Sequence, residues 1–290
     1  MDKKQNNKNK TAEMYNKIVE SVTKIISSGE YEKFLKFSKN FHNYSFKNIV
    51  LIFSQMENAT QVAGFKTWQK MSRKLKKGAK GIQIFYPIKR KCTTIECQNS
   101  IIDGNSDNEN NKQEKITEFL IYRPTYVFDI SQTVGESLPL DDERLNNNTM
   151  QEFFDFLNSY SPYPILEKEL EGGTQGYWSP KNKHIVLKKA LSIDDKTSVL
   201  LHELTHALYD DFDYKKDRNL SESFVESVAF IVADNFGLDT SCCSFNYITS
   251  YLNGDVKILL ELGDKIQKSA NDFISKLETE FDSKNIRVAM

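Results

Sequence analysis

The segment SVLLHELTHALYDD, residues 198–211, constrains the fold of this chain more than any other stretch. His202 and His206 are four residues apart, so on a helix they lie on one face. Two imidazoles that close can bind one zinc ion, which prefers nitrogen, sulfur and carboxylate ligands. Glu203 lies beside this face, where its carboxylate can hold a water molecule and accept a proton from it. The segment therefore predicts a helix that carries a zinc site, with Glu203 as the catalytic base.

The alternative is an ordinary helix that contains two histidines by chance. The residues around them, VLLHELTHAL, are otherwise almost all apolar. Ionisable groups on a buried face are costly unless they are paired or bound to a metal. The context therefore favours zinc.

The third zinc ligand must come from another element, and the next predicted helix, SESFVESVAFIVADNFG, offers two glutamates. Glu226 falls between apolar neighbours and is the preferred ligand, whereas Glu222 lies nearer the exposed start and is the alternative. Asp234 could orient a ligand imidazole, although a solvated helix residue is the simpler interpretation. Three tyrosines are candidates for stabilising a transition state: Tyr177, Tyr209 and Tyr247.

The HELTH motif, with a glutamate twenty residues after its second histidine, resembles the gluzincin branch of the zincin metallopeptidases. The resemblance covers roughly residues 150–240. It implies a zinc peptidase in which an edge strand above the metal pairs with an extended peptide substrate. The segment GYWSPKNKHIVL precedes the helix at the right place to supply that strand.

Charge divides the chain into a basic half and an acidic half. Residues 1–130 hold 23 Lys and Arg against 13 Asp and Glu, a net charge of +10, whereas residues 131–290 hold 16 against 27, a net charge of −11. This asymmetry favours two units with different partners.

The strongest basic segment is GFKTWQKMSRKLKKGAKG, residues 64–81, which has no acidic residue. Phosphates need such unopposed cations, and single-stranded nucleic acid also needs flat side chains on which bases stack. The alternative is a solvated face whose aromatic residues belong to the core. The predicted DNA contacts are Lys66, Trp68, Lys70, Arg73, Lys74, Lys76, Lys77 and Lys80, and further aromatic candidates are Tyr44, Phe46, Phe85 and Tyr86.

Two longer stretches resemble the ArdC-type antirestriction proteins, in particular their LtrC-like members found on conjugative and other mobile elements. The first is NYSFKNIVLIFSQMENATQVAGFKTWQKMSRKLKKGAKGIQIFYPI with the closing RPTYVFDISQTVGESLP, and the second is SESFVESVAFIVADNFGLDTSCCSFNYITSYLNGD. The resemblance covers about residues 12–275. It implies a single-stranded-DNA-binding domain followed by a zincin-like metallopeptidase domain, and it implies Glu226 as the zinc ligand.

The predicted fold class is α+β with two domains, a small α+β DNA-binding domain and a zincin-like domain. Apolar periodicity predicts helices at 12–26, 31–41, 45–56, 64–75, 149–160, 194–210, 221–237, 247–252 and 256–277, and strands at 82–90, 116–129, 176–179 and 184–187. The predicted parts are a disordered tail at 1–11, the DNA-binding domain at 12–130 with a flexible insertion at 98–115, a linker at 131–148 and the metallopeptidase domain at 149–290. The polar N-terminus, the lack of a long apolar run and four unpatterned cysteines lead us to expect a cytoplasmic protein with free thiols.

Two functions follow as hypotheses. In the first, the DNA-binding domain tethers a zinc peptidase that acts on an unidentified protein near transferred single strands. In the second, the protein coats incoming single-stranded DNA and the zincin fold is structural or vestigial. The presence of Glu203 argues against complete loss of catalysis, because a purely structural zinc site does not need it.

Overall fold

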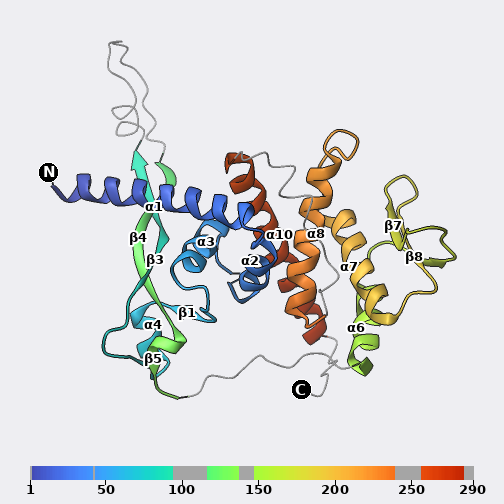
Figure 1. The fold of residues 1–290 in the computed structure, drawn as a ribbon, viewed down its shortest axis with the longest axis horizontal. Helices are drawn as coiled ribbons and strands as arrows, with labels where there is room; N and C mark the ends of the chain where they lie inside the picture. Colours follow the sequence, from blue (N-terminus) through green and yellow to red (C-terminus); the bar gives the residue numbers. More distant parts are fainter. Residues whose placement is uncertain (1, 42, 94–115, 137–146, 239–255, 284–290) are drawn as a thin grey trace, which may run out of the picture.

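The computed structural model describes residues 2–41, 43–93, 116–136, 147–238 and 256–283 of the chain. Its elements form an elongated molecule, with a ribbon of two strands at one end and a small sheet at the other (Figure 1). Helix α10, Val256–Ser283, lies between the two ends and packs against helices of both. Helices and strands both contribute, which confirms the predicted α+β class.

The N-terminal half begins with four α-helices. They are α1 Asp2–Ser27, α2 Tyr31–Ser38, α3 Phe46–Gln55 and α4 Phe65–Lys70, and a 3-10 turn, η1 Lys39–Phe41, follows α2. In α1, Met14, Ile18 and Val22 recur one turn apart and are all buried. The predicted tail at residues 1–11 is instead continuous with α1 from Asp2 onward. No glycine or proline interrupts this stretch, so the packed turns can propagate toward the N-terminus.

Strands β3 Ile82–Thr93 and β4 Ile116–Asp129 form a long antiparallel ribbon that projects from these helices (Figure 1). Helix α3 covers the free edge of β3 with two side-chain amides. Asn48 exchanges hydrogen bonds with the backbone N–H and C=O of Phe85, and Gln55 does the same with Gln83. These amides satisfy backbone groups that an edge strand otherwise leaves open to another chain.

Part of the predicted linker at 131–148 belongs to the folded N-terminal half. After β4 the chain forms a 3-10 turn, η2 Ile130–Gln132, and strand β5 Thr133–Val134, which pairs with β2 Lys74–Leu75. A two-residue strand, β1 Val62–Ala63, pairs with the end of β4. Asp129 caps η2 and also accepts hydrogen bonds from the backbone of Thr60 and Gln61, which explains why the fold continues past residue 130. The predicted insertion at 98–115 lies outside the described residues.

The C-terminal half contains a three-stranded sheet packed against helices. Its elements are α6 Asn147–Tyr160, β6 Ile165–Lys168, β7 Gly176–Ser179, β8 His184–Lys188, α7 Ile193–Tyr209 and α8 Arg218–Asn235. The sheet order is β6-β8-β7, so β7 is an edge strand, and it pairs antiparallel with β8. Strand β6 was not predicted; it pairs in parallel with β8. The helix predicted at 247–252 lies outside the described residues. Across the described part of the chain, no helix combines the length and the apolar character needed to cross a membrane.

The two halves share one hydrophobic core. A single cluster of buried side chains runs from α1 to α10 and includes residues of both halves. Polar contacts cross the same boundary: the Tyr31 and Ser227 hydroxyls lie 3.1 Å apart, and Lys39 lies 3.1 Å from the Asp234 carboxylate. A Cβ atom at Gly263 would lie 2.5 Å from the ring of Phe46, so the absence of a side chain allows α10 to approach α3 this closely. The halves therefore pack as one body through α2, α3, α8 and α10.

Raising the pH is expected to weaken this boundary through Tyr31. Burial raises the pKa of Tyr31 to about 12, although the hydrogen bond with Ser227 acts in the opposite direction. Because this pKa exceeds the value of about 10 in an unfolded chain, the stabilising contribution is complete below pH 10 and is lost as the pH rises through about 12. The unfolding free energy should therefore fall between those pH values by roughly 2–3 kcal/mol more in the wild type than in Tyr31→Phe. Urea denaturation across this range tests the point, and equal slopes in the two proteins would contradict it.

Candidate metal centre

Helix α7 presents His202 and His206 on one face while its other face is buried. The helix begins after Ser192, whose hydroxyl accepts a hydrogen bond from the Asp195 backbone N–H. Leu200, Leu201 and Leu204 are completely buried and fix the helix against the core. The two imidazole rings stand one turn apart, with their centroids separated by 4.9 Å. The predicted histidine face is therefore present.

Helix α8 supplies a carboxylate to this face, and it comes from Glu222. Glu222 Oε2 lies 3.5 Å from Nε2 of His202 and 3.6 Å from Nε2 of His206. Hydrogen bonds with the two histidines hold the pKa of Glu222 well below its usual range, so this carboxylate is ionised. One ligand atom from each of the three residues lies within 4.8 Å of the others, which is compatible with a single ion.

Glu226, the preferred ligand from the sequence, is not part of this cluster. Its Oε2 atom is buried without a hydrogen-bond partner among the described residues, and burial raises its pKa. Glu222 and Glu226 are one turn apart on the same face of α8, so the sequence pattern alone could not separate them. In the structure Glu222 approaches both imidazoles within 3.6 Å, whereas Glu226 interacts with His202 and His206 through charge without a hydrogen bond to either.

Glu203 occupies the position expected of a base. Its side chain is only 7% exposed and receives a hydrogen bond from the backbone of Trp178 on β7. Burial raises the pKa of Glu203, while the nearby histidines partly offset that effect. A carboxylate with a raised pKa is a stronger proton acceptor than an ordinary one.

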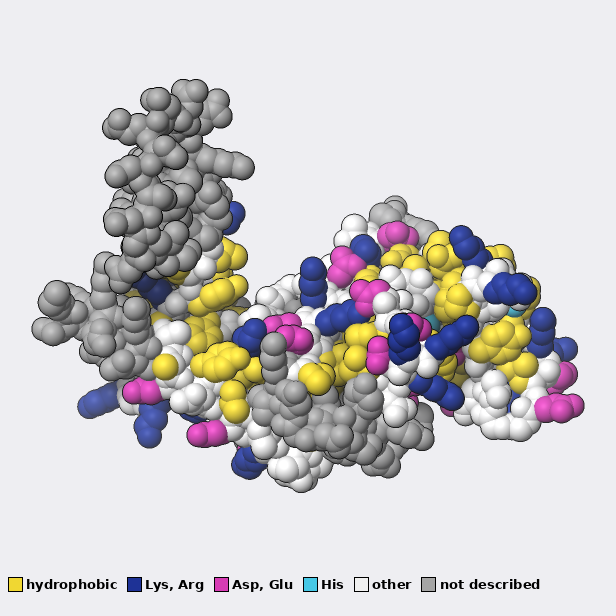
Figure 2. Space-filling view, turned by 90° about the horizontal axis from the view of Figure 1, so that it is seen from above, with side chains coloured by type: hydrophobic (Ala, Val, Ile, Leu, Met, Phe, Trp, Pro, Cys, Tyr) yellow, Lys and Arg dark blue, Asp and Glu magenta, His cyan; other side chains and the backbone are white. Residues whose placement is uncertain are grey.

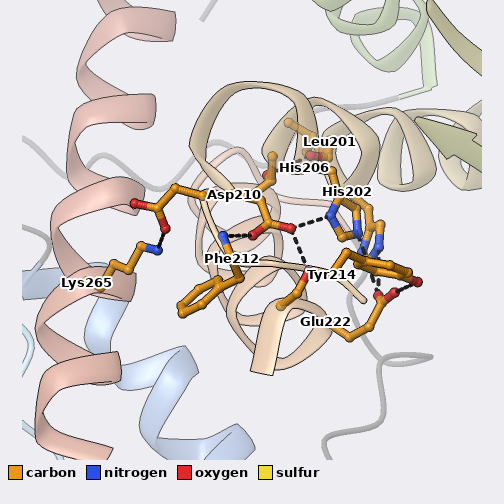
Figure 3. Close-up of polar contacts among 11 residues, drawn as sticks. Leu201, His202, His206, Asp210, Phe212, Tyr214, Glu222 and Lys265 are labelled. Atoms are coloured by element: carbon orange, nitrogen blue, oxygen red, sulfur yellow. Dashed lines mark hydrogen bonds and ion pairs between the residues drawn. The ribbon is translucent and has the colours of Figure 1, made fainter. Parts of the chain in front are cut away.

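Asp210 holds His206 in place (Figure 3). Its Oδ2 atom lies 2.8 Å from Nδ1 of His206 and accepts a hydrogen bond of 2.6 Å from the Ser221 hydroxyl, while its Oδ1 accepts one from the Phe212 backbone. Burial lowers the pKa of His206, but hydrogen bonds to Asp210 and Glu222 outweigh burial and raise it to about 9. Contact with a carboxylate at one ring nitrogen directs the other nitrogen toward a metal.

Asp210 takes the role predicted from the sequence for Asp234. Asp234 is instead paired with Lys39 at the boundary between the halves. The sequence did contain a signal for Asp210, because it follows His206 by four residues and so lies one turn along the same helix face.

Tyr214 directly contacts the cluster and is not among the tyrosines predicted from the sequence. Its hydroxyl donates a hydrogen bond of 2.6 Å to Glu222 Oε1, and its ring packs edge-on near His206 (Figure 3). Of the three predicted tyrosines, Tyr209 donates to Asp272 on α10, Tyr177 is 39% exposed on β7, and Tyr247 lies outside the described residues. The sequence feature that could have indicated Tyr214 is its position between α7 and α8, the two helices that carry the cluster.

The basic segment at 64–81 divides into buried and exposed residues. Trp68 is 1% exposed, and its indole N–H donates to the Phe128 carbonyl at 2.8 Å. Arg73 is 8% exposed and donates to the Thr133 hydroxyl and the Glu136 carbonyl. Both residues belong to the structure of the N-terminal half, so neither is positioned to contact DNA. Six predicted contacts are exposed: Lys66, Lys70, Lys74, Lys76, Lys77 and Lys80.

The other aromatic candidates divide in the same way. Phe46 is buried, and Tyr44 is partly buried with its hydroxyl donating to the Val62 carbonyl. Phe85 is partly buried against the core, whereas Tyr86 is 59% exposed. The alternative stated from the sequence, that these aromatics belong to the core, therefore holds for Trp68 and Phe46.

Comparison with known proteins supports the resemblance to ArdC-type proteins. Residues 5–128 match a family model described as the N-terminal domain of the anti-restriction factor ArdC. The chain is also 26% identical to the uncharacterized protein pXO2-81 of Bacillus anthracis, in an alignment covering 93% of this chain and 52% of that protein. The chain therefore spans about half the length of this relative.

Two crystal structures of the antirestriction protein ArdC from plasmid R388 have a similar fold. The metal-free structure has a TM-score of 0.53 and 15% identity, over 82% of this chain and 86% of ArdC. The Mn(II)-bound structure has a TM-score of 0.53 and 17% identity, over 91% of this chain and 98% of ArdC. The likeness at this identity establishes the fold, and the Mn(II)-bound structure together with the present cluster supports a site for a divalent metal.

Proposed function

We propose that this chain is an antirestriction protein of the ArdC type, in the LtrC-like subgroup, that joins a single-stranded-DNA-binding half to a zincin-like metallopeptidase centre. The observation that carries the proposal is the meeting of Glu222 with both imidazoles of the HELTH helix, beside the buried Glu203. A metal site with only a structural role does not need a buried carboxylate with a raised pKa beside an open ligand position.

The residues present fit a divalent metal. Two imidazole nitrogens and one carboxylate oxygen are a ligand set that zinc favours in catalytic sites, and it leaves a fourth position for water. When bound, the ion supplies Lewis acidity, which polarises a carbonyl group and lowers the pKa of water. We assign His202, His206 and Glu222 as its ligands.

The protein's own groups then divide the remaining work. Glu203 accepts a proton from the attacking water and returns it to the leaving amine. Asp210 keeps the His206 ring oriented. Strand β7 is at the edge of its sheet and contacts α7, so an extended peptide could pair with it next to Glu203.

The DNA-binding part of the proposal rests on charge. The N-terminal half is basic, and six exposed lysines lie within a segment that has no acidic residue. Single-stranded DNA would be attracted to this surface through its phosphate groups, and its binding would weaken as the salt concentration rises.

The function is tested by plasmid transfer into a recipient that restricts incoming DNA. A plasmid carrying the wild-type gene should be established more often than the same plasmid carrying a deletion of that gene. Equal recovery in a restricting recipient would contradict the antirestriction function.

Metal analysis of the purified protein should give about one zinc per chain in the wild type and in Glu226→Gln, and much less in Glu222→Gln. A loss of zinc in Glu226→Gln alone would reverse the ligand assignment.

A further inference from the structure

Strand β4 carries a row of exposed large side chains on one face of the ribbon. Leu120, Tyr122 and Tyr126 are 52%, 57% and 54% exposed. They occupy alternate positions, so they point to the same side of the strand and are spaced about 7 Å for every two residues. The neighbouring residue Val127 points the other way and is buried in the core. In Figure 2, hydrophobic side chains gather over the part of the molecule that holds the β3–β4 ribbon in Figure 1.

The ring of Tyr126 packs against the backbone of Gly81. A Cβ atom there would lie 2.9 Å from Cδ1 of Tyr126 and 3.1 Å from its Cβ, so the Tyr126 ring rests directly on the backbone of Gly81. One side of the ring is thereby supported while half of the residue stays exposed. A ring held in this way is ready to stack without first losing conformational freedom.

A cavity of about 500 Å³ opens beside the same glycine. Lys17 of α1 and Lys80 line it together with Gln55, Met56, Gly81, Ile82 and Gln132, and none of its described lining residues is acidic. The two amides donate their hydrogen bonds to protein backbone: Gln55 to Leu51 and Gln83, and Gln132 to Lys80. Lys17 and Lys80 are therefore the cationic residues that line this cavity.

The cations that line the cavity form no ion pair with a described acidic side chain. This holds for Lys17 and Lys80, and a further cation, Lys89, is paired across the ribbon with Leu120. A protein partner would need acidic side chains to match these cations and a flat apolar surface to cover the rings. Single-stranded nucleic acid supplies both in each nucleotide, a phosphate and an aromatic base.

We infer that single-stranded DNA binds along this face, with bases stacked on Tyr122 and Tyr126 and a backbone phosphate in the cavity between Lys17 and Lys80. The inference rests on the proposed function for its choice of DNA. In this inference the aromatic residues that stack on bases belong to β4, in place of the buried Trp68 that was predicted from the sequence. Duplex DNA should bind less tightly, because its bases are already stacked inside the helix.

The test measures affinity for a fluorescently labelled oligothymidylate by anisotropy. Replacing both Tyr122 and Tyr126 by Ala should weaken binding at least about tenfold, because each base loses a stacking partner. Replacing both by Phe should retain most of the affinity, because stacking needs the ring and not the hydroxyl. Tyr86→Ala tests which face of the ribbon binds: Tyr86 is 59% exposed, but its cross-strand partner is Arg123, so it lies on the opposite face, and a loss of affinity in Tyr86→Ala with none in the Tyr122 and Tyr126 double Ala variant would overturn the inference.

Two further variants test the packing of Tyr126 on Gly81 and the phosphate site. Gly81→Ala should displace the Tyr126 ring and weaken binding while leaving the circular dichroism spectrum unchanged. Lys17→Glu with Lys80→Glu should weaken binding and make it less dependent on salt. If the wild type binds no single-stranded DNA, the DNA part of the proposed function fails. If the wild type binds and the Tyr122 and Tyr126 double Ala variant binds equally well, the inference about this face is overturned.

Discussion

Replacing Glu203 by Gln is expected to leave metal binding intact and to lower the rate of peptide hydrolysis by about a hundredfold or more. Gln has nearly the same shape as Glu, so it can accept the hydrogen bond from the Trp178 backbone. It cannot accept a proton from water, which is the step assigned to Glu203. Burial already disfavours the charged form of this side chain, so the neutral amide should not destabilise the fold.

The experiment combines metal analysis with cleavage of a peptide library followed by mass spectrometry. Glu171→Gln is the matched control, because Glu171 is exposed on the loop between β6 and β7 and has no role in the site. Equal hydrolysis by the wild type and Glu203→Gln would mean that Glu203 is not the base. If neither protein cleaves any peptide and both protect a transferred plasmid, the DNA-coating function replaces the peptidase.

Replacing Trp68 by Ala is expected to lower the unfolding free energy by about 3–5 kcal/mol. Trp68 is among the largest fully buried side chains, and its removal would leave a cavity and an unpaired carbonyl at Phe128. A DNA-contacting tryptophan would behave differently, because its loss would lower affinity and leave stability unchanged.

Urea denaturation measures this effect. Lys66→Ala is the control, since Lys66 is exposed two residues earlier on the same helix, and its unfolding free energy should stay within about 0.5 kcal/mol of the wild type. A Trp68→Ala protein as stable as the wild type, but with weaker DNA binding, would restore the original prediction from the sequence.

The sequence predicted well those features that depend on local pattern. Most of the helices and strands follow from periodic apolar residues, such as Met14, Ile18 and Val22 in α1. The pair of histidines on α7 follows from a spacing of four residues, which fixes their common face on any helix. In these cases the relevant contact lies within one element or one hairpin.

The features that the sequence could not predict depend on how elements cross. Glu222 and Glu226 are equivalent by spacing, and only the packing of α8 against α7 distinguishes them. The burial of Trp68 and Arg73 depends on their contacts with Phe128, Thr133 and Glu136, about sixty residues later in the chain. A cationic segment with a tryptophan has the same composition whether its tryptophan faces solvent or core.

Helix α8 contacts both halves of the molecule. Glu222 on this helix approaches the histidines, while Ser227 and Asp234 contact Tyr31 and Lys39 of the N-terminal half. Two ligands that bias the position of one shared helix obey thermodynamic reciprocity: the factor by which metal changes DNA affinity equals the factor by which DNA changes metal affinity. Titrating either ligand in the presence of the other therefore reports a single coupling free energy, whichever of the two is varied.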